Sequence, residues 1–320
     1  MRLYSFALTL ALLGALAPAL RAQTYPARPV RIVVPVPPGG IIDVVGRLLA
    51  QKMTEQTGQS AIIDNRTGGL TGVGSELVAR SAGDGYTLLL QSLPMVINPA
   101  VLGKMSYDYE KDLAPISLVV TSPFLLVVHP SVPAKSIREL IAVARAQPRR
   151  ITYSSSGNAS NQHVAIELFA GIAGVQMLHV PYRGGGPALS AVLGGESDLS
   201  ALAVSAVMPY VSAGRMRALA ITSRQRLPAL PQIPTAAESV PGYDFASWVG
   251  VLAPAATPPA LVNTINGIVV KAARAPDLVE RFTKDATDVV ANSPAEFRAF
   301  IQSEATRWAK VVKDSGMRAD

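Results

Sequence analysis

Residues 30–58 join a short apolar run, a Pro-Gly-Gly turn and an amphipathic helical pattern, in that order. The β-branched run at 30–34 predicts a buried strand, and the prolines behind it end the strand because proline has no N–H for a sheet ladder. Gly39 and Gly40 allow a sharp turn with no side chain in the way. The next segment predicts a helix that ends at Gly58 and has one apolar face, formed by Val45, Leu48, Leu49 and Met53.

The start of this helix is a candidate anion site. Free N–H groups there point toward the glycine turn, and such helix ends attract anions, carboxylates included. The turn is not a P-loop, because no Gly-Lys-Ser/Thr follows it, and it does not read Gly-x-Gly-x-x-Gly. The pattern therefore predicts an anion at a helix start without naming the anion.

The first 22 residues are typical of a cleavable export signal. Arg2 supplies the positive end, and the apolar run at 6–16 is too short to span a membrane comfortably. Cleavage is expected after Ala19 or Ala22, and an uncleaved anchor is the alternative. The chain has no cysteine, which excludes a lipid-modified cysteine and a disulfide. We expect a soluble periplasmic protein after export.

The charge pattern argues against nucleic-acid binding. Removing Arg2 and Arg21 with the signal lowers the net charge from +7 to +5, and the remaining basic residues are scattered. A nucleic-acid surface would need a clustered basic stripe with interleaved aromatic residues, whereas aromatic residues make up 6% of this chain.

Strand-like and helix-like segments alternate along most of the chain, which predicts two α/β domains with largely parallel sheets. The apolar stretch at 116–128 is too long for one ordinary strand. It predicts either two strands or one strand that passes between domains. A second crossing is expected near 245–253. We therefore expect lobe 1 at 24–121 plus 250–320 and lobe 2 at 122–249, with a hinge of two segments.

Lobe 2 carries the clearest helix signals. Ser136 and Glu139 form the pattern of a capping box. Ser160 is a candidate N-cap of the helix that follows the SGNAS turn. The glycines at 184–186 could cradle an anion, although a tight connection is the favoured interpretation. Phe245 and Trp248 are expected to pack in the core or the hinge.

An enzyme is the competing class. Ser156 and His163 could in principle serve as nucleophile and base, but no Gly-x-Ser-x-Gly elbow is present. The histidines, His129, His163 and His179, have no metal-ligand spacing. We expect no catalytic activity, no metal and no cofactor. A structural role is the favoured interpretation of His163.

Five segments carry a resemblance to a known family: YPARPVRIVVPVPPGGIIDVVGRLLA, IIDNRTGGLTGVGSELVARSAGDGYTLLL, SSGNASNQHVAIELF, HVPYRGGGPALSAVLGG and RALAITS. The chain resembles the Bug/TctC proteins, the extracytoplasmic solute-binding components of tripartite tricarboxylate transporters. The resemblance implies a two-lobed periplasmic-binding-protein fold of the Venus flytrap type 2. It also implies a protein that binds a small carboxylate (a di- or tricarboxylate, acidic amino acid or aromatic acid) and docks on membrane permease subunits. We expect it to be a monomer or to associate weakly. The same clamp could instead serve a sensor.

The resemblance also implies where the ligand lies. One carboxylate is expected in the turn at 37–43, held by backbone N–H groups and water, and the turn at 154–160 contributes from lobe 2. Ile41 and Ile42 stand where relatives carry smaller or polar residues, which predicts a more apolar pocket. Asp43 is expected mainly to complement the helix dipole. The expected ligand-binding residues are Pro38, Gly39, Gly40, Ile41, Ile42, Asp43, Ser92, Ser155, Ser156, Asn158, Ser160, Ala203, Val204 and Ser205.

Overall fold

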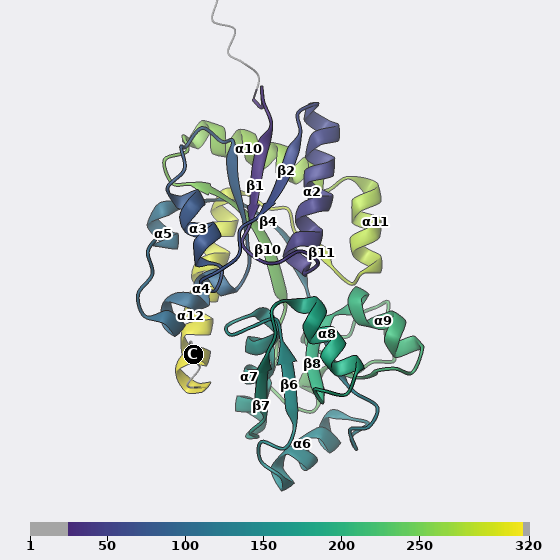
Figure 1. Ribbon diagram of the computed structural model, residues 1–320. Coiled ribbons are helices and arrows are strands. Elements are labelled where there is room, and N and C mark those ends of the chain that lie inside the picture. The colour runs from purple at the N-terminus through teal and green to yellow at the C-terminus, as the bar shows by residue number, and fades with distance from the viewer. Residues whose placement is uncertain (1–24, 316–320) are drawn as a thin grey trace, which may run out of the picture.

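The structure is a computed structural model that describes residues 25–315, so the predicted signal at 1–22 lies outside the described residues. Two β-sheets, each covered by helices, form an upper and a lower lobe in Figure 1. We call the elements around the six-stranded sheet lobe 1 and those around the five-stranded sheet lobe 2. The predicted two-lobed α/β architecture is confirmed.

Lobe 1 contains the sheet β11-β4-β10-β3-β1-β2. Its strands are β1 (Val30–Val34), β2 (Ala61–Asn65), β3 (Thr87–Gln91), β4 (Leu113–Ser122), β10 (Ser247–Pro254) and β11 (Asp288–Val289). Its helices are α2 (Ile41–Thr57), α3 (Gly72–Ala79), α4 (Pro94–Leu102), α5 (Tyr109–Asp112), α10 (Pro259–Ala273), α11 (Pro276–Lys284) and α12 (Pro294–Ser315).

Lobe 2 contains the sheet β7-β6-β8-β5-β9. Its strands are β5 (Phe124–Val128), β6 (Thr152–Ser155), β7 (Leu178–Pro181), β8 (Leu199–Ala203) and β9 (Arg217–Ile221). Its helices are α6 (Ile137–Ala146), α7 (Asn161–Ala173), α8 (Gly185–Leu193), α9 (Val204–Ser212) and the 3-10 turn η1 (Ala236–Glu238).

Both sheets are mixed, and the prediction of largely parallel sheets was wrong. β1 pairs in parallel with β2 and β3, but β10 runs antiparallel to β3 and β4. Likewise β6 is parallel to β7 and β8, whereas β5 is antiparallel to β8 and β9. The reason lies in the crossings. β5 begins where the chain has crossed from lobe 1 into lobe 2, and β10 begins where it has crossed back into lobe 1. Both strands therefore run away from the lobe junction, whereas β3, β4, β8 and β9 run toward it.

The polypeptide crosses between the two described sheets twice. β4 ends at Ser122 and β5 begins at Phe124, so Pro123 alone separates two strands of different sheets. The long apolar stretch at 116–128 thus contains parts of two strands, β4 in the lobe 1 sheet and β5 in the lobe 2 sheet. The second crossing leads through Phe245 into β10. Thr222 forms backbone hydrogen bonds with both crossings. Its N–H donates to the carbonyl of Phe124 in the first crossing, and its carbonyl accepts from the N–H of Phe245 in the second.

Helix α12 packs against the second crossing. The Trp308 ring meets Phe245 edge-on at 5.7 Å, and Trp248 meets Phe297 edge-on at 5.9 Å. A Cβ atom at Gly250 would overlap the Phe297 ring, so β10 needs glycine there for α12 to approach. Phe245 and Trp248 are both buried, which confirms the expected packing role.

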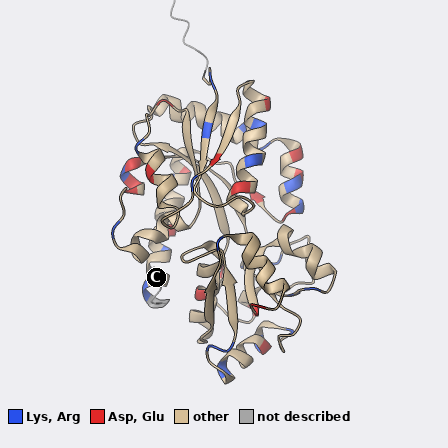
Figure 2. Ribbon diagram, in the orientation of Figure 1, with Lys and Arg blue, Asp and Glu red and all other residues tan. Residues whose placement is uncertain are grey.

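The surface carries dispersed charge. Figure 2 shows basic and acidic positions spread over both lobes, without a continuous basic stripe among the described residues. No helix between residues 25 and 315 is both long and apolar enough to cross a membrane.

Candidate functional site

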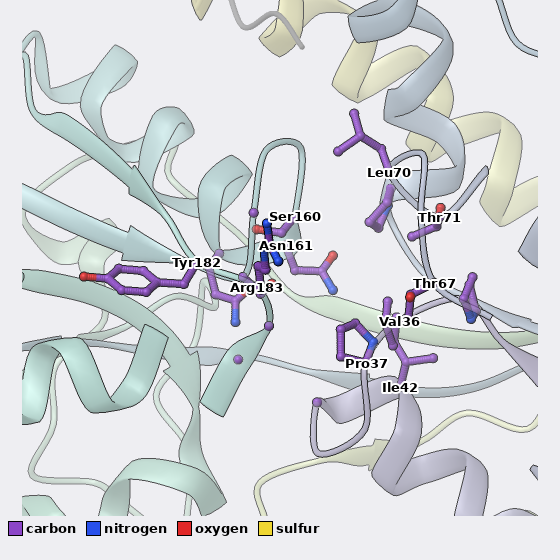
Figure 3. A pocket seen from close by; sticks show the side chains of 18 of the residues that line it. Val36, Pro37, Ile42, Thr67, Leu70, Thr71, Ser160, Asn161, Tyr182 and Arg183 are labelled. Atoms are coloured by element: carbon purple, nitrogen blue, oxygen red, sulfur yellow. The ribbon is translucent and has the colours of Figure 1, made fainter. Parts of the chain in front are cut away.

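A cavity of about 450 Å³ lies between the lobes. Figure 3 shows its two walls, with Val36, Leu70 and Thr71 among the labelled lobe 1 residues and Ser160 and Asn161 across from them. The residues that line it are Pro35, Val36, Pro37, Gly40, Ile41, Ile42, Thr67, Gly68, Leu70, Thr71, Pro94, Phe124, Ser156, Gly157, Asn158, Ser160, Asn161, Gln162, Tyr182, Arg183, Gly184 and Gly185.

Five helices of the described chain begin at this cavity. The lining includes the N-cap or first residue of each: Gly40 for α2, Thr71 for α3, Pro94 for α4, Ser160 for α7 and Gly184 for α8. A helix N-terminus carries roughly half a positive charge. The first N–H groups of α3 and α4 already donate to loop carbonyls, for example Gly72 N–H to Gly69 and Met95 N–H to Ser92, so these two helices contribute mainly through their dipoles. The convergence of the five helix starts makes the cavity electropositive without a cluster of basic side chains.

The side chains add to this polarity. Within the described residues, Arg183 is the one ionisable cation of the lining, and no aspartate or glutamate lines the cavity. Arg183 is exposed and lines the cavity from the loop between β7 and α8. The described lining therefore combines helix starts with one basic residue and contains no carboxylate.

The α2 turn presents open backbone to the cavity. Gly39 has φ +92°, a left-handed conformation that favours glycine, and Gly40 is an extended N-cap with φ −80°. The first backbone bond of the helix runs from Val44 N–H to the Gly40 carbonyl, so the N–H groups of Gly40, Ile41 and Ile42 precede the helical ladder. A Cβ atom at Gly40 would have no neighbour within 4 Å, because it would project into open space.

Asp43 supports this turn without lining the cavity. Its carboxylate accepts hydrogen bonds from Gly39 N–H (3.0 Å), from Arg47 Nε (2.9 Å) and from Asn65 Nδ2 (3.0 Å). Burial acts to raise the pKa of Asp43, but the hydrogen bonds from Arg47, Asn65 and Gly39 outweigh it and hold the pKa below its usual range. The residue thus does more than complement the helix dipole, because it fixes the shape of the glycine turn.

Several side chains of the lobe 2 turn between β6 and α7 form hydrogen bonds within the turn or with the start of α7. Ser160 caps α7 by accepting from His163 N–H, as predicted, and the Ser156 hydroxyl donates to Gln162 Oε1 at 2.6 Å. Ser155 lies behind the cavity lining, where its hydroxyl contacts the Gly157 carbonyl (2.9 Å) and His179 Nε2 (2.6 Å).

The imagined Ser156–His163 pair does not form. His163 is buried and its Nδ1 accepts from the Ala159 N–H at 3.1 Å. Its ring stacks on His179 with centroids 3.9 Å apart. Burial, and then the neighbouring His179, lower the pKa of His163 to about 3. The geometry gives His163 a structural role.

Asn161 lines the cavity and joins the two lobes. From the first position of α7, its Nδ2 donates to Ser92 Oγ (3.1 Å), just beyond β3, and to Ser247 Oγ (3.0 Å), where β10 begins. All three residues are buried. At the cavity edge the lobes also approach closely, because a Cβ at Gly184 would lie 3.6 Å from Pro37 Cβ. These contacts describe closed lobes.

The structure brings part of the expected residue set to the cavity. Gly40, Ile41, Ile42, Ser156, Asn158 and Ser160 line it. Pro38, Gly39, Asp43, Ser92 and Ser155 lie beside it in supporting positions, whereas Ala203, Val204 and Ser205 form the junction of β8 and α9 and do not line it.

Sequence reasoning did not single out several lining residues, among them Thr67, Leu70, Thr71, Phe124, Gln162 and Arg183. The Gly-rich turn at 67–69 and the Arg-Gly-Gly-Gly segment were signals for some of them. The helix α4 also went unpredicted.

No group of histidine, cysteine, aspartate or glutamate suited to a metal ion occurs among residues 25–315. Asp43, in the first turn of α2, does not offer a metal ligand either, because its carboxylate oxygens already accept hydrogen bonds from Gly39, Arg47 and Asn65.

Comparisons with known proteins place these features in a family. The family model described as tripartite tricarboxylate transporter family receptor, TctC, matches residues 45–317. Protein BugT of Bordetella pertussis is 35% identical over 306 residues, which cover 95% of this chain and 94% of that one.

Solved structures agree with the sequence comparison. An R. palustris protein with adipate is 35% identical, with a TM-score of 0.87 and coverage of 92% of this chain and 99% of that chain. MatC from Rhodopseudomonas palustris with bound malate is 30% identical, with a TM-score of 0.84 and coverage of 90% and 100%. Both solved structures share the two-lobed fold seen here. The chain belongs to the TctC family of tripartite tricarboxylate transporter receptors.

Proposed function

We propose that the protein is a periplasmic receptor that captures a small carboxylate between its lobes and delivers it to a tripartite membrane permease. The observation that carries this proposal is the cavity in which five helices of the described chain begin and which no acidic side chain lines. Such a site favours anions over neutral or cationic solutes.

One ligand carboxylate is assigned to the α2 turn. The N–H groups of Gly40, Ile41 and Ile42 lie there, and the lobe 2 residues Ser156 and Ser160 line the opposite side. Backbone donors suit a carboxylate because they are fixed before binding and lose little side-chain entropy. The two isoleucines place apolar surface next to the anion position.

Arg183 makes a second acidic group favourable. Its guanidinium can pair with a carboxylate in two parallel hydrogen bonds. The adipate and malate of the related structures are both dicarboxylates. The ligand proposed for this chain is likewise a small dicarboxylate, and a cavity of about 450 Å³ is in the range of small-molecule sites.

Lobe closure is the proposed mechanism. The ligand contacts both lobes only when they are shut, so its binding shifts the population toward the closed form. The proposed moving bodies are 24–121 plus 250–320 and 122–249. The two crossings supply the hinge, and the closed monomer is the form that docks on the permease subunits.

A thermal-shift screen tests this function. The mature protein is heated with mono-, di- and tricarboxylates, acidic amino acids and aromatic acids, since a ligand that binds the native state raises the apparent Tm. We expect a dicarboxylate to give the largest shift and to reduce the radius of gyration in small-angle scattering. No shift with any carboxylate would refute the proposal.

A further inference from the structure

The loop between β2 and α3 has an unusual backbone. Four consecutive residues have positive φ angles: Gly68 (+126°), Gly69 (+54°), Leu70 (+51°) and Thr71 (+76°). Glycine adopts this region readily, but leucine and threonine do so at a cost because their Cβ approaches the backbone. Strained non-glycine residues cluster at ligand-binding and active sites, so a strained leucine beside the cavity is a candidate for a functional role.

Buried polar groups hold the loop in this conformation. Gln91 Nε2 donates to Thr71 Oγ1 and to Ser75 Oγ, both at 2.9 Å, and the Ser75 hydroxyl donates to the Thr71 carbonyl at 2.9 Å. The side chain of Asn98 donates to the Leu70 carbonyl. Gln91, Ser75 and Asn98 are fully buried, so the loop is fastened from the lobe 1 core.

The result is that Leu70 forms part of the cavity wall. It is half-buried, and Figure 3 shows it on the lobe 1 side, across from Ser160 and Asn161. The other apolar residues of the lining are Pro35, Val36, Pro37, Ile41, Ile42, Pro94 and Phe124, most of them on the lobe 1 side. The anion-binding helix starts therefore lie next to hydrocarbon surface.

We propose that Leu70 is a specificity-determining residue that packs against the hydrocarbon part of the ligand and selects carboxylates with an unsubstituted carbon skeleton. This inference rests on the proposed carboxylate-binding function. The carboxylate is bound by helix starts that any small acid can use, whereas contact with Leu70 grows with each methylene group. A hydroxyl group placed against this wall would lose water without gaining a partner.

The test is a homologous series, titrated by calorimetry: succinate, glutarate and adipate, with malate as the hydroxylated counterpart of succinate. For the wild-type protein we expect each added methylene to tighten binding by about fourfold, and succinate to bind more tightly than malate. In Leu70→Asn the gain per methylene should fall to less than about twofold, because the apolar contact is lost.

Two measurements separate this role from a structural one. Asparagine tolerates left-handed backbone, so the Tm of Leu70→Asn should equal or exceed that of the wild type. The matched variant Leu70→Met keeps apolar surface and should retain the gain per methylene. An unchanged gain in Leu70→Asn, or equal binding of succinate and malate by the wild type, would overturn the inference.

The same measurements distinguish a failure of the Leu70 assignment from a failure of the proposed receptor function. If none of the four acids binds while another carboxylate of the thermal screen does, the Leu70 assignment is refuted and the receptor function stands. If no carboxylate of either set binds, the receptor function itself is refuted.

Discussion

The Asp43 carboxylate lies 3.0 Å from the backbone nitrogen of Gly39, and this contact couples the first turn of α2 to the glycine turn that precedes it. The same carboxylate accepts from Arg47 and Asn65, so its neighbours in the structure are donors. A carboxylate suits this position because it accepts at both oxygens, which an amide does not.

Replacing Asp43 by asparagine should therefore be more harmful than the loss of a helix-dipole contact. The new NH₂ group faces donors, and we expect a loss of about 1–3 kcal/mol in the free energy of unfolding, measured with urea. Arg47→Gln, which keeps the Gly39 contact, is the control and should cost less. If Asp43→Asn lowers the free energy of unfolding by less than about 1 kcal/mol, Asp43 only complements the helix dipole and does not fix the shape of the turn.

Gly40→Val tests the position of the ligand. The side chain would project into open space at a residue with φ −80°, so it fills the cavity without straining the turn. We expect the carboxylate affinity to fall by more than about 100-fold, with a normal circular dichroism spectrum. Gly267→Val in α10, which also meets no neighbour, should bind normally. Full affinity in a folded Gly40→Val variant would move the site elsewhere.

Asn161→Ala tests the contact between the lobes. The change removes the bonds to Ser92 and Ser247 and should favour the open form, with a larger radius of gyration without ligand and an affinity about tenfold lower. Asn266→Ala is the matched control, since Asn266 donates to two carbonyls within lobe 1. If both variants keep the wild-type dimensions, Asn161 does not hold the lobes together.

His163 should make the protein less stable in mild acid. Its pKa of about 3 in the folded state is below the unfolded value of 6.5, so the unfolded chain binds the additional proton between these values. The contribution of His163 to the free energy of unfolding is thus fully present above pH 6.5. It decreases as the pH falls below 6.5, by up to about 1.4 kcal/mol per pH unit.

The variant His163→Asn keeps an acceptor for the Ala159 N–H but does not titrate. Urea unfolding between pH 7 and pH 5 should show a flatter decline in the variant than in the wild type. Parallel profiles for the two proteins would show that His163 is not the group responsible.

Local signals accounted for much of the fold. Gly58 ends α2 with φ +72°, and Ser136 and Ser160 cap their helices through nearby N–H groups, so short-range chemistry was sufficient there. The helix α4 was missed because it begins after Leu93 without a capping side chain and contains a proline at position 99. The sheet directions were missed because they depend on where the chain crosses between lobes.

The candidate site was predictable only in its turns. Glycines and serines at strand ends indicated the α2 and α7 turns, but the strain at Leu70 comes from Gln91 and Asn98, more than 20 residues away in sequence. Arg183 lines the cavity from the loop between β7 and α8, opposite residues of lobe 1. The glycines near residues 67–69 and 184–186 mark turns, but which side chains of these turns face the cavity depends on the tertiary fold.

The most direct test compares a charged ligand with its neutral counterpart. The dicarboxylate that gives the largest thermal shift and its diamide, which has nearly the same shape, are titrated calorimetrically into the wild-type protein. Because helix starts and Arg183 stabilise negative charge, we predict saturable one-to-one binding of the dicarboxylate and an affinity at least about 100-fold lower for the diamide. Equal affinities for the two compounds would contradict the assignment of the cavity as a carboxylate site.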